Sequence, residues 1–410
     1  MNVIISIGHG RLHLIQSAKW IAEAGVSVKL ICGWVPRCAN SLWVRLASKI
    51  VGRDLTAGMA KRIVRDAAYE TCTCTFAEVV DQVLRIACRR LGISTQRVAS
   101  LGWSVFGWQS RGYLRDAQVF HVRSGAGQGG AIQVARKRGM RILVDHSALH
   151  PTVSERLLRD DYARWGQEIV IAPNLGVWRN VEQDCREADM IMVNADHIRD
   201  SFVEEGYDPQ KVRVVYLGVR EDFWGLKKEY WRQGRITVLF TGGFQILKGA
   251  EYLLQSLEIL KSRGVDARCL VVGEVAIPHE LKERYGDLPV RYFGHIPQDE
   301  LKGYLASADL YLFPSLADGC ASSGMEALAA GLPVIATRRS GLPIVDGESG
   351  FLVEERNAGA IADKIEWLMA HPEEMVRVGR AGAELVRNHY SWKNYAENVK
   401  GIYEDLSHQS

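Results

Sequence analysis

The chain has 410 residues, more than the roughly 250–300 residues at which single hydrophobic cores stop growing, so two domains are expected. Its hydrophobic content of 47%, charged content of 24% and mean hydropathy of -0.09 exclude a disordered chain, collagen and a coiled coil. No run approaches the ~18 apolar residues of a membrane-spanning helix, and the N-terminus lacks the basic segment of a signal peptide. We therefore expect a cytoplasmic protein.

The net charge of +3 conceals a basic segment near the N-terminus. Residues 36–115 contain 13 Lys and Arg against 5 Asp and Glu, a local charge of +8, which leaves −5 for the rest of the chain. The first helix predicted there has an apolar and a basic stripe, formed by Trp43, Leu46 and Ile50 and by Arg45, Lys49 and Arg53. Two interpretations stay open: a surface helix that covers a sheet, or an interfacial helix on an anionic membrane.

The eight cysteines are expected to be free thiols, because disulfide scaffolds are small and dense in cysteine. Cys72 and Cys74 do not have the C-x-x-C spacing, and no second pair accompanies them. The sequence therefore predicts no zinc site.

The first half of the chain alternates strand and helix patterns, as in a parallel sheet built from βαβ units. Strands are predicted over 3–7, 26–31, 117–121, 141–145, 190–193 and 212–216, and helices over 14–22, 131–137 and 181–188. A mainly helical pattern at 40–92 separates the first βαβ unit from the second.

The second half repeats this rhythm after a polar, irregular stretch at 218–234. Strands are predicted over 236–240, 269–272, 290–293 and 310–313, and helices over 252–263 and 301–306. Two similar α/β domains in tandem are the simplest account.

The densest functional signal begins where the strand ends at Pro314. A glycine-bearing loop follows, and a helix begins near Ser323 and ends before Gly331. Open parallel sheets bind ligands at such junctions, and helix N-termini favour phosphate and sugar oxygens. The N–H groups expected to face the ligand are those of Cys320, Ala321, Ser322 and Ser323.

Asp318 on this loop and Glu326 in the first turn of the helix are eight residues apart and can face one cleft. Carboxylates accept hydrogen bonds from the vicinal hydroxyls of ribose or hexose. In the alternative interpretation, Glu326 only complements the helix dipole and Asp318 is a turn residue.

A second glycine-rich loop, residues 241–249, follows the strand at 236–240. Glycines such as Gly243 allow close approach of a backbone to a ligand, and Lys248 supplies a charge for a diphosphate. The loop lacks the order of a Walker motif.

Together, residues 236–353 resemble the donor-binding domain of glycosyltransferase family 4, retaining enzymes of the GT-B fold. The resemblance rests on the loop with Lys248, on 292–296, 308–315 and 347–353, and on the acid pair Asp318 and Glu326; looser similarity covers 188–193, 214–219 and 390–392. It implies an α/β fold of two Rossmann-like domains facing across a cleft, residues 1–217 for the acceptor and 218–390 for the donor. A C-terminal helix of about residues 391–410 would cross back to the first domain.

The resemblance implies a role for each candidate residue. Glu326 resembles the ribose-binding carboxylate, Lys248 the lysine that neutralises the diphosphate, and residues 320–323 the loop that binds sugar and phosphate. Asp318 and His146 would orient the transferred sugar, although a histidine at a strand end is often structural. The Gly8–Gly10 loop would donate to the leaving phosphate from the first domain.

Two residues depart from the family pattern. Gly243 stands where the family usually has an arginine, so half of the diphosphate clamp is missing unless Arg338 or Arg339 supplies a charge. Asp318 replaces the commoner glutamate, which shortens the arm that reaches the sugar.

The activity implied is retaining transfer of a sugar from a UDP- or GDP-sugar to a carbohydrate or lipid-linked acceptor, in polysaccharide, lipopolysaccharide or glycolipid synthesis. The chain contains no D-x-D triplet, so neither a metal nor a cofactor is expected. We expect a cytoplasmic protein, peripheral on the inner membrane face through the helices of residues 40–92. Nucleic acid is not expected, because the pI of 8.3 is modest.

Two other classes of protein compete with this activity. A non-catalytic binder of nucleotide sugars, or a partner of another glycosyltransferase, is the alternative that Gly243 suggests. A nicotinamide dehydrogenase is disfavoured because His13 stands where the G-x-G-x-x-G pattern needs a glycine.

Overall fold

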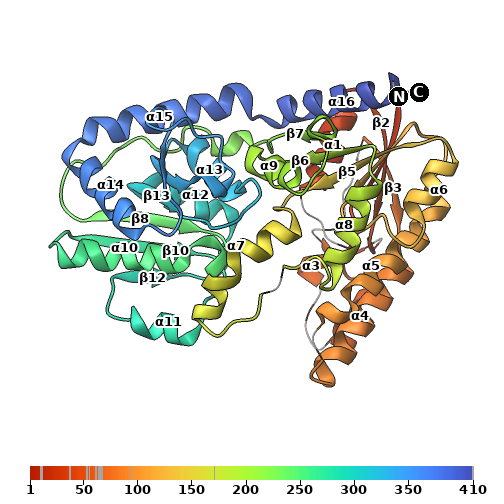
Figure 1. Ribbon diagram of the computed structural model, residues 1–410, viewed down its shortest axis with the longest axis horizontal. Coiled ribbons are helices and arrows are strands. Elements are labelled where there is room, and N and C mark those ends of the chain that lie inside the picture. Colours follow the sequence, from red (N-terminus) through yellow and green to blue (C-terminus); the bar gives the residue numbers. More distant parts are fainter. Residues whose placement is uncertain are drawn as a thin grey trace.

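The computed structural model describes residues 1–9, 13–36, 38–51, 54, 56–60, 62, 68–93, 95–169 and 171–408. These residues form two parallel sheets that lie side by side and are flanked by helices (Figure 1). The predicted α/β architecture with two parallel-sheet domains is confirmed.

The first sheet has seven parallel strands in the order β3-β2-β1-β4-β5-β6-β7. Its strands are β1 (Asn2–Ser6), β2 (Ser27–Cys32), β3 (Glu70–Thr73), β4 (Val119–Arg123), β5 (Arg141–His146), β6 (Met190–Val193) and β7 (Val212–Val214). The helical pattern at 40–92 did not predict β3. This edge strand is short and its sequence, Glu-Thr-Cys-Thr, has no apolar run that would reveal it.

The second sheet has six strands in the order β12-β10-β8-β13-β14-β15. Its strands are β8 (Ile236–Thr241), β10 (Ala267–Val272), β12 (Val290–Tyr292), β13 (Leu310–Phe313), β14 (Val334–Thr337) and β15 (Phe351–Val353), and a separate pair joins β9 (Phe244–Gln245) to β11 (Val275–Ala276). The central strands β8 and β13 are buried on both faces, because helices cover both sides of a parallel sheet.

Helices connect the strands in both halves. The first half contains α1 (Leu14–Glu23), α2 (Leu42–Val51), α3 (Thr56–Ala60), α4 (Thr75–Arg90), α5 (Gln96–Ser110), η1 (Arg111–Tyr113), α6 (Ala131–Lys137), α7 (Pro151–Arg164), α8 (Val177–Glu187), α9 (Asp196–Glu204) and η2 (Pro209–Lys211). The second contains η3 (Glu221–Phe223), η4 (Ile246–Lys248), α10 (Ala250–Ser262), α11 (His279–Arg284), α12 (Gln298–Ser307), α13 (Ser322–Ala330), η5 (Arg338–Ser340), α14 (Ala358–Ala370) and α15 (Pro372–His389). No described helix is both long and apolar enough to cross a membrane.

The last helix, α16 (Trp392–His408), returns from the second half and packs on α1 of the first, as predicted (Figure 1). Tyr395 shares a 2.9 Å hydrogen bond with Ser17 of α1, and the Tyr403 hydroxyl lies 2.6 Å from His121 Nδ1 on β4. Two buried tyrosines with polar partners therefore fix the position of α16 on the first sheet.

The chain passes between the halves twice, and the two passages are bonded to each other. The Val219 N–H donates to the carbonyl of Tyr390 over 2.8 Å, and Val219 forms a bridge with Ser391. A Cβ on Gly218 would lie 2.5 Å from the Cα of Trp392, so glycine permits this close approach. We propose the domain boundary at 217/218, because the segment between β7 and β8 adds no strand to either sheet.

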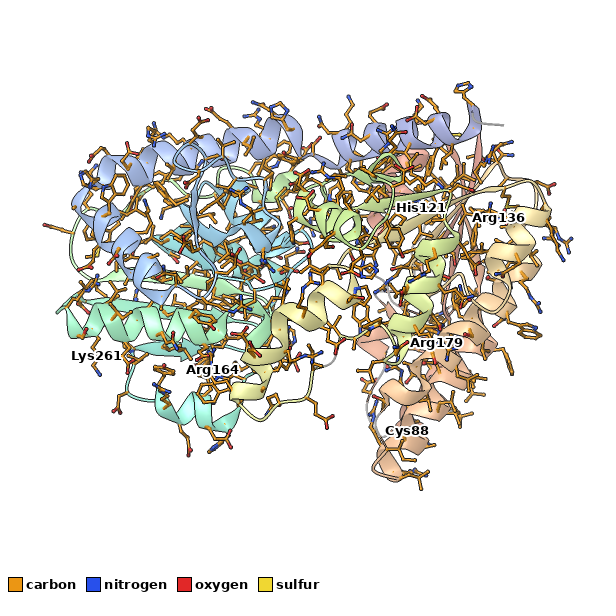
Figure 2. The ribbon with its side chains drawn as sticks, viewed as in Figure 1. Cys88, His121, Arg136, Arg164, Arg179 and Lys261 are labelled. Carbon is orange, nitrogen blue, oxygen red and sulfur yellow. The ribbon has the colours of Figure 1, made fainter. Side chains whose placement is uncertain are left out.

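Helix α7 joins the halves elsewhere. Its buried Asp161 accepts hydrogen bonds from Tyr252 (2.5 Å) and from Arg356 (2.6 and 2.9 Å) of the second half. At the end of α7, Arg164 lies 3.1 Å from both carboxylate oxygens of Glu251; Figure 2 shows this arginine pointing toward the second half. These polar contacts hold the halves together where no chain crosses.

All eight cysteines, each within the described residues, are free, as predicted. Burial raises the pKa of Cys74 to about 12 and that of Cys72 to about 11. Both are neutral thiols near pH 7, in keeping with a packing role.

The loop after β4 is organised by one buried carboxylate, Asp184 of α8. It accepts hydrogen bonds from the N–H groups of Gly125 (2.7 Å) and Gly127 (2.8 Å) and from the Gln128 amide (2.6 Å). Burial raises the pKa of Asp184 to about 7 although these donors oppose the shift. This loop stands at the carboxyl edge of the first sheet, where functional loops gather.

Replacing Asp184 by alanine is expected to lower the free energy of unfolding by about 3 kcal/mol, because three buried donors lose their acceptor. Urea denaturation at pH 7.5 measures the loss. The control is Asp200→Ala, whose exposed carboxylate pairs with its neighbour Arg199 and should matter little. Equal stability of the two variants would contradict the assigned role.

Candidate active site

The two halves meet at the loop that follows β13. A Cβ on Gly319 would lie 2.4 Å from the carbonyl oxygen of Ser147, after β5, and 3.0 Å from Asn194 Oδ1, after β6. The carboxyl edges of the two sheets therefore meet here, where α/β folds bind ligands.

Asp318 stands at the centre of this junction. Its carboxylate forms an ion pair with Lys248 at the end of η4, so the two glycine-bearing loops are brought together. A Cβ on Gly249 would lie 1.9 Å from the carbonyl oxygen of Pro314, and its φ is +74°, so only glycine lets these loops touch. Both side chains of the ion pair are largely buried.

The backbone of Asp318 is fixed from both sides. Its N–H donates to the Arg339 carbonyl over 2.9 Å, and its carbonyl accepts a 2.8 Å hydrogen bond from His197 Nε2 of the first half. Asp318 Oδ1 also accepts from the N–H of Gly319 over 2.7 Å. Burial lowers the pKa of His197, so this imidazole is neutral near pH 7. The second oxygen, Oδ2, makes the ion pair with Lys248.

The start of α13 differs from the sequence prediction. The Ala321 N–H already donates to the Ser340 carbonyl over 3.1 Å, so it does not face a ligand as predicted. Ser323 accepts a 2.9 Å hydrogen bond from the Tyr311 hydroxyl, and Ser322 is exposed. Burial raises the pKa of Cys320 to about 12, so its side chain is a neutral thiol.

Glu326 lies in the second turn of α13, not in the first turn as predicted, because the helix begins at Ser322. Burial raises the pKa of Glu326 to about 7, with Arg220 opposing the shift and Asp222 adding to it. No hydrogen bond occupies its carboxylate within the described part of the chain. It is thus a half-buried acceptor with free capacity for hydroxyl groups.

His146 ends β5 and is buried. Its Nδ1 lies 2.8 Å from the Ser124 hydroxyl, and its ring contacts Phe202 at a centroid distance of 5.2 Å. Burial lowers the pKa of His146 to about 4, against the opposing effect of the Leu149 backbone. A neutral imidazole orients a partner by hydrogen bonding without carrying charge.

Of the three glycines predicted for the site, the two that are described differ in their surroundings. Gly8 has a φ of +67°, and a Cβ there would lie 2.4 Å from the ring of Trp103, so both backbone and space require glycine. A Cβ on Gly243 would meet only the Gln245 amide, at 3.5 Å. Space therefore does not explain the absence of the family arginine at Gly243. Gly10 lies outside the described residues.

Arg338 and Arg339 are the predicted substitutes for that arginine. Arg339 faces Glu355, with 3.8 Å between Nε and Oε1. Both arginines line a cavity of about 470 Å³ between α7, α9 and the loops of the second sheet. Neither Asp318 nor Glu326 lines this cavity, although His197, which is bonded to the Asp318 carbonyl, does.

Sequence reasoning missed three groups near the carboxyl edge of the first sheet. His197 holds Asp318, as described. Arg123, at the end of β4, lies over the Trp103 ring at 5.2 Å, and burial lowers its pKa to about 10 while Asp145 opposes the shift. Burial alone would raise the pKa of Asp145. His13, whose Nε2 lies 3.2 Å from Asp145 Oδ2, and His121 instead hold this pKa well below its usual range. Each of these groups ends or follows a strand, a position that could have identified it.

The architecture and the junction define a class of protein. Two parallel-sheet α/β domains with the last helix crossing back are the GT-B glycosyltransferase fold. In agreement, residues 235–371 match the family model described as "Glycosyl transferases group 1". Sucrose-phosphate synthase from Thermosynechococcus elongatus superposes with a TM-score of 0.71 at 18% identity, covering 100% of both chains. HepE from Anabaena, solved with UDP, superposes with a TM-score of 0.64 at 13% identity, covering 99% and 100%.

Among curated proteins, the chain is similar to D-inositol 3-phosphate glycosyltransferase from Corynebacterium glutamicum strain R. The two are 28% identical over 241 residues, which are 53% of this chain and 57% of the relative. The chain thus matches little more than half the length of this relative. Over this part of its length, the chain resembles glycosyltransferases.

Proposed function

We propose that the protein is a retaining, metal-independent glycosyltransferase of the family 4 type, which transfers a sugar from a UDP- or GDP-sugar to an acceptor held by residues 1–217. The observation that carries this proposal is the Lys248–Asp318 ion pair at the junction of the halves, with His197 of the first half bonded to the same loop. The donor lies against residues 218–390. The Anabaena protein solved with UDP supports a UDP-type donor.

The chemistry needs charge stabilisation rather than a covalent intermediate. The bond between the sugar carbon and the diphosphate oxygen breaks as the acceptor oxygen bonds to that carbon on the same face. The departing phosphate oxygen takes the acceptor proton, so configuration is retained. Lys248 and the N-terminus of α13 stabilise the negative charge that develops on the diphosphate.

The remaining side chains bind and orient. Glu326 accepts hydrogen bonds from the ribose hydroxyls, because its carboxylate is half-buried and has free acceptor capacity. Asp318 and His146 hold the transferred sugar from the two halves. Lys248 is paired with Asp318 in the structure, so the diphosphate competes with this carboxylate for the ammonium when the donor binds.

We place this reaction in the synthesis of cell-surface polysaccharide, lipopolysaccharide or glycolipid, with a carbohydrate or lipid-linked acceptor. The basic balance of residues 36–115 supports a location at the inner face of an anionic membrane. Arg123 at the edge of the first sheet is a cation available to an anionic acceptor.

A mass-spectrometric screen of UDP- and GDP-sugars tests the proposal by measuring donor hydrolysis. Wild type is expected to hydrolyse one donor, and Lys248→Ala and Glu326→Ala are expected to lose at least about 100-fold in rate. Equal hydrolysis by all three proteins would remove the site assignment. UDP or GDP binding without hydrolysis of any donor would replace the enzyme by a non-catalytic binder.

A further inference from the structure

Helix α4 exposes apolar side chains and buries acidic ones. Phe76, Val79 and Val83 are 57%, 52% and 57% exposed. Glu78 and Asp81, on the opposite face, are only 5% and 3% exposed. Positions i, i+3 and i+7 share one side of a helix, so the apolar residues form a continuous stripe along α4. A helix that covers a sheet has the reverse arrangement.

Specific contacts fix this orientation of α4. Glu78 accepts hydrogen bonds from the Trp34 N–H and from Arg62. Asp81 packs against α5, where a Cβ on Gly102 would lie 2.5 Å from Asp81 Oδ1. Rotating the helix to bury its apolar stripe would break the bonds of Glu78 and this packing of Asp81, so the fold maintains the exposed stripe.

The apolar surface continues onto the turn and the helix that follow. Trp108 of α5 is exposed, and its ring lies 6.4 Å from that of Phe76 between centroids. Leu91 and Ile93, in the turn between α4 and α5, are also exposed. We call this surface the docking face; it consists of Phe76, Val79, Val83, Leu91, Ile93 and Trp108. Exposed apolar patches of this kind on folded proteins mark interaction sites.

Among the described residues of α4, the turn after it and α5, the exposed charges are cationic. The acids of this segment, Glu78 and Asp81, are turned inward. Arg89 and Arg90 are exposed, and Arg111, directly after α5, lies over the Trp108 ring at 5.5 Å. An apolar stripe with a cationic border matches the interface of a bilayer that contains anionic lipids.

A second copy of the chain fits this surface less well. A twofold contact through the docking face would bring the arginines of both copies together, and like charges at an interface oppose association. Figure 1 shows α4 and α5 extending below the first sheet to the lower edge of the molecule, and Figure 2 shows Cys88 near the lower end of α4. The helices therefore reach outward, where a membrane surface can meet them.

We propose that the docking face binds an anionic membrane by inserting its apolar side chains among the lipid headgroups. This surface differs from the one predicted on α2, where Arg45 and Lys49 are exposed but so is Leu46 of the apolar stripe. The side chains of Trp43 and Ile50, and all of Arg53, lie outside the described residues. The docking face is remote from Asp318 in the chain and is assigned independently of the transfer reaction.

Sedimentation with vesicles tests this proposal. Wild type is expected to pellet with vesicles of phosphatidylglycerol and phosphatidylcholine, and to bind vesicles of phosphatidylcholine alone at least about tenfold more weakly. The triple variant Phe76→Gln, Val79→Gln, Val83→Gln should bind the anionic vesicles at least about tenfold more weakly than wild type. These positions are exposed, so the melting temperature of the variant should stay close to that of wild type.

The matched control is Val203→Gln with Val345→Gln, two exposed valines outside the docking face. This control should sediment with anionic vesicles as wild type does. Unchanged binding of the triple variant would overturn the proposal, as would wild type that fails to bind anionic vesicles. A dimer in analytical ultracentrifugation that the triple variant abolishes would assign the face to a second copy instead. Vesicle binding has no activity readout, so loss of the proposed function leaves this test intact.

Discussion

Replacing Asp318 by asparagine is expected to slow sugar transfer by about 100-fold while UDP affinity stays equal or rises. The carboxylate is the acceptor proposed to hold the sugar, and asparagine offers a weaker, uncharged one. The same change releases Lys248 from its ion pair, which leaves the ammonium free for the diphosphate. Steady-state rates and isothermal titration with UDP measure the two effects separately.

A purely structural role for Asp318 would give a different result. Asparagine keeps the oxygen that accepts from the Gly319 N–H, so the loop should remain folded. The control is Asp363→Asn, in which an exposed aspartate of α14 loses its charge beside Arg263. If Asp318→Asn lowered UDP affinity and kcat in parallel with the melting temperature, the assigned role in binding the sugar would be wrong.

The affinity for UDP is expected to rise between pH 6 and pH 8, because Glu326 must ionise to become a strong acceptor. With a pKa of about 7, this carboxyl is about one-tenth ionised at pH 6 and about nine-tenths ionised at pH 8. Glu326→Gln should bind UDP about tenfold more weakly at pH 8 and lose the part of the pH dependence that Glu326 contributes. Titrations of both proteins across this range measure the difference, since the phosphate of UDP titrates equally in each.

The stability of the folded protein should fall as the pH rises, whereas the affinity for UDP should increase. The folded pKa of Glu326 lies above its ordinary value of 4.5, so the folded state binds this proton more tightly than the unfolded state. Stability is then lost as the pH rises from about 4.5 to about 7, by roughly 3 kcal/mol at most. Glu326→Gln should therefore melt at a higher temperature than wild type at pH 8, and at the same temperature near pH 5. A variant that melts lower at pH 8 would contradict the burial of an unpaired carboxylate.

The sequence predicted those elements whose signal is local. Strands β6 and β13 and helix α6 have the predicted bounds, because buried parallel strands are continuous apolar runs and Gly139 follows α6. The polar edge strand β3 has no such run. Its place in the sheet depends on pairing with β2, which periodicity does not reveal.

The candidate site was predictable where each residue follows a strand. Lys248 and Asp318 lie on loops after β8 and β13, which are neighbours in the sheet, and the structure brings their side chains together. The contact between His197 and Asp318 joins positions 121 residues apart and depends on how the halves pack. The environment of Glu326 likewise depends on Arg220 and Asp222, which no motif connects to it.

The exposed face of helix α4 is a further feature that the sequence does not predict. The rule that apolar residues face inward predicts the wrong side of this helix, because Glu78 accepts from the Trp34 N–H and Asp81 packs against Gly102 of α5. Only the three-dimensional environment distinguishes a stripe that fills a core from one left for a partner.

The paired passages near Val219 and Ser391 have a mechanical consequence. Two connections bonded at one place behave as a single hinge, so one half can swing relative to the other only about an axis through that point. Opening would then widen the junction at Gly319 and pull apart the contacts of α7 with Arg356 and Glu251. The rates at which a donor enters and a nucleotide product leaves would then depend on how fast the ion pairs of α7 with Arg356 and Glu251 break.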